Sequence, residues 1–153
     1  MPSPTAKTRS KARAAARLNA VQALYQQEME GIATAPLLHE FHQHRLGATI
    51  EGVEYADPDV TFFDDLVQGV IVRREEIDRL IAAKLSSDWS FERLDKAMRQ
   101  ILRAGTYELL ARPDVPVGAV INEYLDVTDA FYGRREKGFV NGLLDAIAKE
   151  VRG

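Results

Sequence analysis

The sequence predicts an all-α protein of six or seven helices joined by short loops. Apolar residues recur every three or four positions over most of the 153 residues, which is the spacing of helices that bury one face. Glycine, proline and serine interrupt this pattern at short intervals. No segment alternates apolar and polar residues in the way that is typical of a strand, and no internal repeat is present.

Two helices are expected in the first third of the chain. Residues 1–8 contain two prolines and are expected to be disordered. From about Arg9 a helical pattern runs to Gly31, a residue type that commonly ends helices. A shorter helix is predicted over residues 36–46, and the glycines of residues 47–57 indicate a loop. The apolar positions of the first helix are Leu18, Val21, Tyr25 and Met29.

The middle of the chain predicts one long helix or two. Asp57 is a suitable N-cap, and Pro58 is a suitable first-turn residue. The helical pattern continues to about Leu85, either as one helix or as two that meet near residues 69–74. Residues 86–88 form a break.

The last part of the chain predicts three more helices. They cover about residues 91–111, 117–131 and 136–151, and the first and last of them carry their apolar residues on one side. Prolines in residues 112–116 and a glycine in residues 132–133 separate them.

The expected domain organisation is a disordered basic arm followed by one helical domain. The arm comprises residues 1–12, and the domain comprises residues 13–153. Within the domain, the N-terminal helices extend to about residue 46, and a larger C-terminal helical set begins at about residue 58.

Composition excludes several classes of protein. The chain has no cysteine, so a disulfide framework, a cysteine nucleophile and a thiolate metal site are excluded. No apolar run reaches about 18 residues, so no membrane span is predicted, and a cytoplasmic location is expected. The acid-free N-terminus, rich in serine, alanine and arginine, also fits an organellar transit peptide, which is the alternative.

The net charge of −3 conceals a strong asymmetry. Residues 1–17 carry five basic side chains and no acid, whereas the remaining 136 residues carry 15 basic and 23 acidic ones. A localised basic segment on an acidic body can bind phosphates. The five basic residues are Lys7, Arg9, Lys11, Arg13 and Arg17.

Two basic clusters are candidates for binding phosphate groups. In the first, Arg9, Arg13 and Arg17 are spaced by four and lie on one side of a helix, beside the face that carries Tyr25. Their cations suit phosphates, and the ring suits a base, although a solvated helix face is the alternative. The second cluster opens the last helix, where free backbone N–H groups favour anions, although Phe139 could instead belong to the core. It comprises Arg134, Arg135, Lys137 and Phe139.

Nothing in the sequence indicates catalysis, a cofactor or a metal. The run His39, His42, His44 nearly matches a zinc-protease motif, but Gln43 stands where the second histidine is needed. Neighbouring carboxylates at 64–65 and 75–76 point in different directions on a helix and are expected to be solvated. Trp89 and Tyr107 are expected to be core residues rather than anchors for a partner.

Five segments, in order along the chain, resemble the NusB family. They are RAAARLNAVQALY (13–25), ILRAGTYELL (101–110), DVP (114–116), VINE (120–123) and FVNGLLD (139–145). The resemblance implies seven helices in two small bundles. It also implies a non-catalytic antitermination factor that pairs with NusE, binds boxA RNA of nascent ribosomal transcripts and joins the elongating RNA polymerase complex.

The resemblance also implies which residues make contacts. Family RNA contacts fall here on Arg13, Arg17, Tyr25, Lys137 and Phe139, and the family's arginine run is diluted by alanines at 14–15. An acidic position that the family associates with NusE is a methionine here. The candidate partner-binding residues are Asp95, Met98 and Arg99.

Two alternative functions remain open. NusB-like helical domains also occur in a family of ribosomal RNA cytosine methyltransferases, but this chain shows no glycine-rich βα unit for such an enzyme. The other alternative is a structural, dimerising helical protein, and a homodimer would also be compatible with RNA binding. Neutralising the basic arm would change nothing in a purely structural protein.

Overall fold

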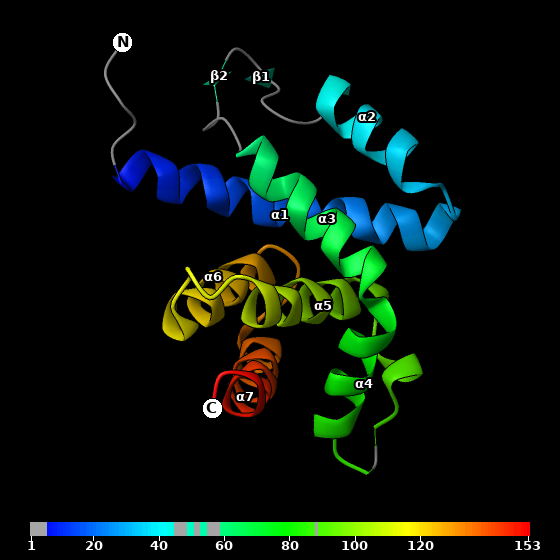
Figure 1. Ribbon diagram of the computed structural model, residues 1–153, viewed down its shortest axis with the longest axis vertical. Helices are drawn as coiled ribbons and strands as arrows, with labels where there is room; N and C mark the ends of the chain where they lie inside the picture. Colours follow the sequence, from blue (N-terminus) through cyan, green and yellow to red (C-terminus); the bar gives the residue numbers. More distant parts are fainter. Residues whose placement is uncertain (1–5, 45–48, 51–52, 55–58, 88) are drawn as a thin grey trace. The chain divides into compact units, whose positions relative to one another are not determined.

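The computed structural model describes residues 6–44, 49–50, 53–54, 59–87 and 89–153, and the side chains are described from residue 8 onward, outside the 49–54 segment. The chain forms two compact units, Met1–Gln68 and Gly69–Gly153 (Figure 1). The division falls inside a helix rather than at the loop 47–57, where the sequence suggested the break.

The first unit is built from three helices and a very short hairpin. Helices α1 (Ala6–Glu30) and α2 (Thr34–His44) precede α3 (Val60–Val72), whose first nine residues belong to this unit. Strands β1 (Thr49–Ile50) and β2 (Val53–Glu54) pair antiparallel within the segment predicted to be a loop. Two residues per strand cannot form a layer, so the predicted all-α class is confirmed.

Helix α1 starts earlier than the sequence suggested. It begins at Ala6, so residues 6–12 are helical and the expected disordered arm is wrong over this range, while residues 1–5 lie outside the described part. Alanine, lysine and arginine favour helix, and no breaker follows Pro4. At the other end, Gly31 has a positive φ of 67°, and its N–H donates to the Gln27 carbonyl at 2.8 Å, so the predicted end is confirmed.

Helix α3 begins two residues later than predicted. The proposed cap, Asp57, and Pro58 lie outside the described residues. The helix starts at Val60, and the carboxylate of Asp59 accepts a hydrogen bond from the N–H of Phe62 at 3.0 Å. Asp59 therefore provides the N-cap interaction that the sequence assigned to a neighbouring aspartate.

The core of the first unit joins α2 to α3. The rings of Phe41 and Phe63 stack with centroids 5.6 Å apart. Gln26 of α1 donates to Glu40 of α2 at 3.1 Å, and His42 lies 2.7 Å from Asp64. The fully or nearly buried apolar side chains include Ala16, Ala20, Val21, Leu24, Leu37, Leu38, Phe41, Phe62, Phe63 and Leu66.

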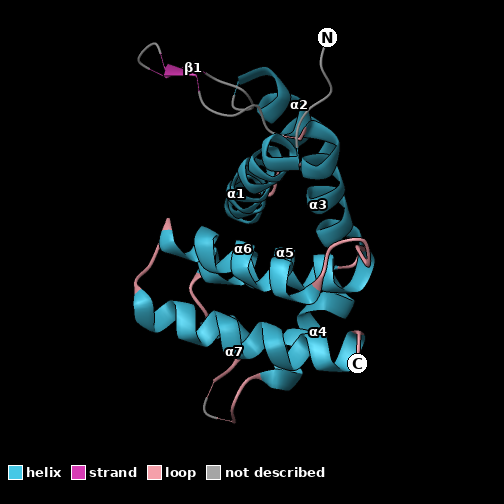
Figure 2. Cartoon of the chain, turned by 90° about the vertical axis from the view of Figure 1, so that its left-hand side faces the viewer, coloured by secondary structure: helices cyan, strands magenta, loops and turns pink. Residues whose placement is uncertain are grey.

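The second unit is a bundle around α5. It contains α4 (Arg74–Lys84), the 3-10 turn η1 (Phe91–Arg93), α5 (Lys96–Ala111), α6 (Val117–Asp129) and α7 (Arg134–Val151). Helix α5 packs against α4, α6 and α7, and nearly all of its residues from Met98 to Leu109 are buried (Figure 2). The predicted helices of this region are confirmed, and a break at Arg73 makes α3 and α4 two helices.

Three polar contacts tie this second bundle together. Arg103 of α5 forms a two-pronged ion pair with Asp78 of α4, with both N–O distances at 2.9 Å. The hydroxyl of Tyr124 donates to Glu108 at 2.7 Å, and both residues are fully buried. The guanidinium of Arg152, just after α7, donates to four backbone carbonyls at and beyond the end of α5.

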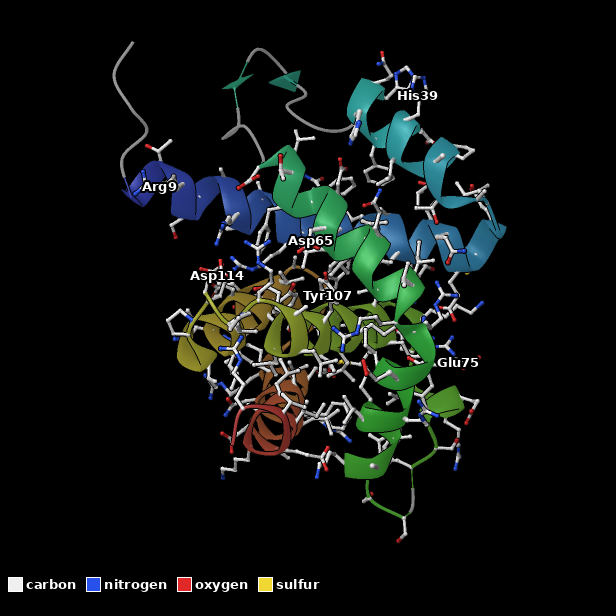
Figure 3. The ribbon with its side chains drawn as sticks, in the orientation of Figure 1. Arg9, His39, Asp65, Glu75, Tyr107 and Asp114 are labelled. Carbon is white, nitrogen blue, oxygen red and sulfur yellow. The ribbon has the colours of Figure 1, made fainter. Side chains whose placement is uncertain are left out.

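One glycine of this bundle is required by a close approach. The ring of Tyr107, on α5, lies where a side chain on Gly69 would stand (Tyr107 is labelled in Figure 3). Tyr107 is buried, so the prediction of a core residue is confirmed. Among the described residues, no helix has the length and apolar character needed to cross a membrane.

Candidate RNA-binding surfaces

The start of α1 carries exposed basic side chains. Arg9 and Lys11 are exposed in the first turns of the helix, where Figure 3 labels Arg9, and the side chain of Lys7 lies outside the described part. Because these residues lie on the helix rather than on a disordered arm, their cations have a fixed spacing. Such a row can contact successive phosphates without disturbing the core.

The arginine stripe does not reach solvent along its whole length. The guanidinium of Arg13 lies 4.5 Å from the ring centre of Phe62, and that of Arg17 lies 5.0 Å from it. Arg13 is about one-third exposed and approaches Asp59 at 3.7 Å, whereas Arg17 is only 3% exposed. The spacing of four places these residues on one side of α1, as predicted, but Phe62 packs on that side. The burial of Arg17 favours a structural role, so we leave it out of the proposed surface.

The aromatic residue of the N-terminal segment is accessible. Tyr25 is 41% exposed on α1, and Met29, one turn later, is also exposed. An exposed ring of this kind can stack on an unpaired base.

The start of α7 forms a second basic surface. Arg134 and Arg135 are exposed and have no ion-pair partner among the described residues. Lys137 pairs with Asp129 at 3.0 Å, and Glu136 accepts a hydrogen bond from the Gly133 N–H at 3.2 Å. Free N–H groups at this helix start add positive potential to the cations.

A pocket beside this helix start brings two groups of predicted residues together. Arg135 and Phe139, predicted to contact RNA, line it with Asp95 and Met98, predicted to contact a partner protein. The pocket has a volume of about 560 Å³. Asp95 accepts a hydrogen bond from the Tyr132 hydroxyl, and Met98 is a buried residue of the pocket lining.

Arg99 lies outside this pocket, whereas Trp89 lies inside it. The guanidinium of Arg99 lies 5.8 Å from the ring centre of Phe91 and does not line this pocket. Trp89 does line the pocket and is 53% exposed, so the prediction that it is a core residue is wrong. It precedes η1 in a non-helical segment, and the break predicted at residues 86–88 was the signal that could have placed it at the surface.

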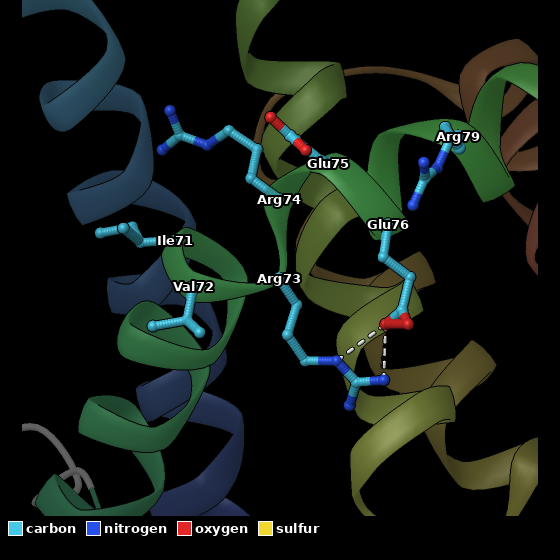
Figure 4. Close-up of a pocket in the computed structure, with 7 residues that line it drawn as sticks. All are labelled: Ile71, Val72, Arg73, Arg74, Glu75, Glu76 and Arg79. Atoms are coloured by element: carbon cyan, nitrogen blue, oxygen red, sulfur yellow. Dashed lines mark hydrogen bonds and ion pairs between the residues drawn. The ribbon is translucent and has the colours of Figure 1, made fainter.

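A further pocket lies where α3 passes into α4, at the place where the sequence suggested that two helices meet (Figure 4). Arg73 donates to Glu76 at 2.8 Å, and the side chain of Glu76 is 45% exposed, so this carboxylate lies at the surface as expected. The lining residues are Ile71, Val72, Arg73, Arg74, Glu75, Glu76 and Arg79.

The histidines of α2 are surface residues, with His39 labelled in Figure 3. Of the other two, His42 is held by Asp64. In the part of the chain that the structure describes, no three histidine, aspartate or glutamate side chains are grouped to hold a metal.

Exposed basic side chains at the starts of α1 and α7, with Tyr25 exposed further along α1, are features that an RNA-binding protein can use. The profile of the NusB family matches residues 14–149. The transcription antitermination protein NusB of Sphingopyxis alaskensis is 65% identical over 144 residues, covering 94% of this chain and 97% of its own. The protein of the same name from Caulobacter vibrioides is 47% identical over 140 residues, covering 92% and 94%.

Solved structures agree with these sequence relatives. NusB of T. maritima superposes with a TM-score of 0.72 and 30% identity, covering 98% of this chain and 94% of that one. A chain from the crystal structure of antitermination factors NusB and NusE in complex with double-stranded RNA superposes with a TM-score of 0.71 and 25% identity, covering 95% and 99%. This chain belongs to the NusB family, whose members are antitermination factors rather than enzymes, so the predicted absence of catalysis is confirmed.

Proposed function

We propose that this protein binds boxA-type single-stranded RNA of nascent ribosomal transcripts together with NusE, and carries that complex to elongating RNA polymerase in the cytoplasm. The observation that carries the proposal is the surface at the start of α7, where Arg134 and Arg135 are exposed and Arg135 lines a pocket with the half-buried Phe139. In the first unit, Arg9 and Lys11 near the start of α1 supply further exposed cations, and Tyr25 near its end supplies an exposed ring. The related structure that contains NusB, NusE and RNA supports the choice of partners.

The chemistry of these surfaces suits single strands. Arginine and lysine contact phosphates and supply affinity, whereas aromatic rings stack on bases that are not already paired. Each surface is small, so the protein alone is expected to bind weakly. A partner that adds basic surface should tighten binding.

The decisive experiment is fluorescence anisotropy with a boxA RNA, a scrambled RNA and a duplex, each with and without NusE. Preference for boxA that increases with NusE is the expected result. Equal binding of all three RNAs would reduce the proposal to a general affinity for phosphate. The mass of the free protein in solution, measured in parallel, tests whether a homodimer forms.

Binding is expected to weaken steeply with salt. With three to five phosphate contacts, the log–log slope of affinity against salt should be roughly −2 to −3.5, because each single-strand contact contributes about −0.7. The measurement is a titration of the boxA RNA at several salt concentrations. A flat response would contradict a role for the basic residues.

Neutralising the α7 arginines tests the second surface. Replacing both Arg134 and Arg135 by glutamine should weaken RNA binding and make the salt slope about 1.4 less steep. Arg79→Gln is the control, because Arg79 is an exposed arginine of the same unit that lines a different pocket. The same loss of affinity per charge in the control would show that only net charge matters.

A further inference from the structure

One cation of the proposed RNA surface is already bound by a carboxylate of the same chain. The ammonium of Lys137, in the first turn of α7, lies 3.0 Å from Asp129, the last residue of α6. The two side chains are 34% and 51% exposed, so the pair lies at the surface. The other two cations of this helix start, Arg134 and Arg135, have no such partner among the described residues.

The pair forms part of a pocket that a nucleotide could enter. Its volume is about 460 Å³, and Arg134 and Asn141 line it beside the pair. No atom lies within 4 Å of the place where a side chain on Gly138 would stand, so the approach over this glycine is open. The exposed amide of Asn141 can both donate to and accept from a base edge.

Helix stability does not explain the position of either charge. Asp129 lies at the negative end of α6, and Lys137 lies at the positive end of α7, so each is at the less favourable end of its helix. Their mutual attraction offsets this cost only in part, because exposed ion pairs are weak. Asp129 can therefore be neutralised without an expected loss of helix.

The carboxylate competes with any phosphate that approaches Lys137. A phosphate must either displace Asp129 or share the ammonium with it, and the two negative groups repel each other at that distance. Arg134, beside the pair in the pocket, offers a contact that Asp129 does not occupy.

We propose that Asp129 sets the RNA affinity of this surface by holding Lys137, and that a phosphate of single-stranded RNA displaces it on binding. The inference rests on the proposed RNA-binding function and adds a residue outside the family motifs quoted above. It makes Asp129 a negative determinant: the surface binds RNA more weakly than its cations alone would allow.

The test compares two aspartates that each form an exposed ion pair with a lysine, one beside the proposed RNA surface and one further along α7. Asp129→Asn removes the pair with Lys137, and Asp145→Asn removes the exposed pair with Lys149 at 3.1 Å on the outer part of α7. Both aspartates are 51% exposed, so the two changes remove the same charge from similar surroundings. Binding of the boxA RNA in the presence of NusE is measured for the wild-type protein and both variants at moderate salt.

Asp129→Asn is expected to raise the affinity by about two- to fivefold, which is the scale of an exposed ion pair. Asp145→Asn should have a clearly smaller effect. In a Lys137→Met background, Asp129→Asn should no longer raise the affinity, because the Asp129 carboxylate then has no ammonium to withhold from a phosphate.

Three results would contradict this inference. Equal gains from Asp129→Asn and Asp145→Asn would overturn the inference and leave RNA binding intact, as would a gain that persists with Lys137→Met. Wild-type protein that fails to bind the RNA, with or without NusE, would overturn the proposed function and the inference with it.

Discussion

Replacing Arg103 by methionine should lower the free energy of unfolding by about 3 kcal/mol. The guanidinium is buried, with its side chain 5% exposed, and both of its prongs bond to Asp78 at 2.9 Å. The guanidinium also donates a hydrogen bond to the side-chain oxygen of Gln100 at 3.3 Å and lies 5.2 Å from the ring centre of Phe91. Methionine keeps the apolar stem but leaves the carboxylate of Asp78, which is only 24% exposed, without its cation.

Urea denaturation monitored by circular dichroism measures this loss. Arg79→Met is the matched control, because it removes the same charge from an exposed position next to Asp78 in sequence. Arg103→Lys should recover only part of the stability, since an ammonium cannot reproduce the planar two-pronged contact. Equal midpoints for Arg103→Met and Arg79→Met would show that the pair contributes little.

Replacing Arg152 by methionine should cost about 2–3 kcal/mol. Its guanidinium donates to the carbonyls of Leu109 at 2.9 Å, Glu108 at 3.0 Å and Arg112 at 2.7 Å. A fourth bond, at 2.6 Å, reaches Val115 in the loop that follows. The carbonyls of Glu108 and Arg112 each also accept a backbone N–H, whereas that of Leu109 faces Pro113, which has no N–H to donate, so Arg152 is the donor that α5 itself cannot supply there.

Thermal unfolding is the suitable measurement for this second change. Lys149→Met removes a cation from the last turn of the same helix, but its side chain is 78% exposed and pairs only with Asp145. A clear fall in Tm for Arg152→Met alone is the expected result. Equal falls for both variants would assign the effect to the charge near the end of α7 rather than to the capped carbonyls.

Helix ends that depend on local residues were predictable from the sequence. Gly31 ends α1 because it adopts a positive φ, and the prolines of residues 112–116 separate α5 from α6. The helical periods of α5 and α7 predicted their buried faces correctly. These features depend on the backbone preferences of a few neighbouring residues, so one sequence suffices to predict them.

Features that depend on distant residues were not predictable in this way. Spacing placed Arg13 and Arg17 on one side of α1 but could not show that Phe62 packs on that side. The pair between Arg103 and Asp78 joins residues 25 positions apart, and nothing in the sequence marks it. The exposed basic residues at the start of α7 were identified correctly as surface cations, whereas the carboxylate that holds Lys137 comes from the preceding helix.

The contacts of Arg152 also have a consequence for the order of folding. Arg152 follows Arg112, whose carbonyl it satisfies, by 40 residues. At about 5–20 residues per second, a ribosome needs roughly 2–8 s to synthesise that stretch. Throughout this interval the carbonyl of Leu109 lacks the guanidinium that bonds it in the complete fold. The second bundle therefore completes its fold only after α7 has been translated. The contacts of Arg152 with the end of α5 form seconds after α5 itself has been synthesised.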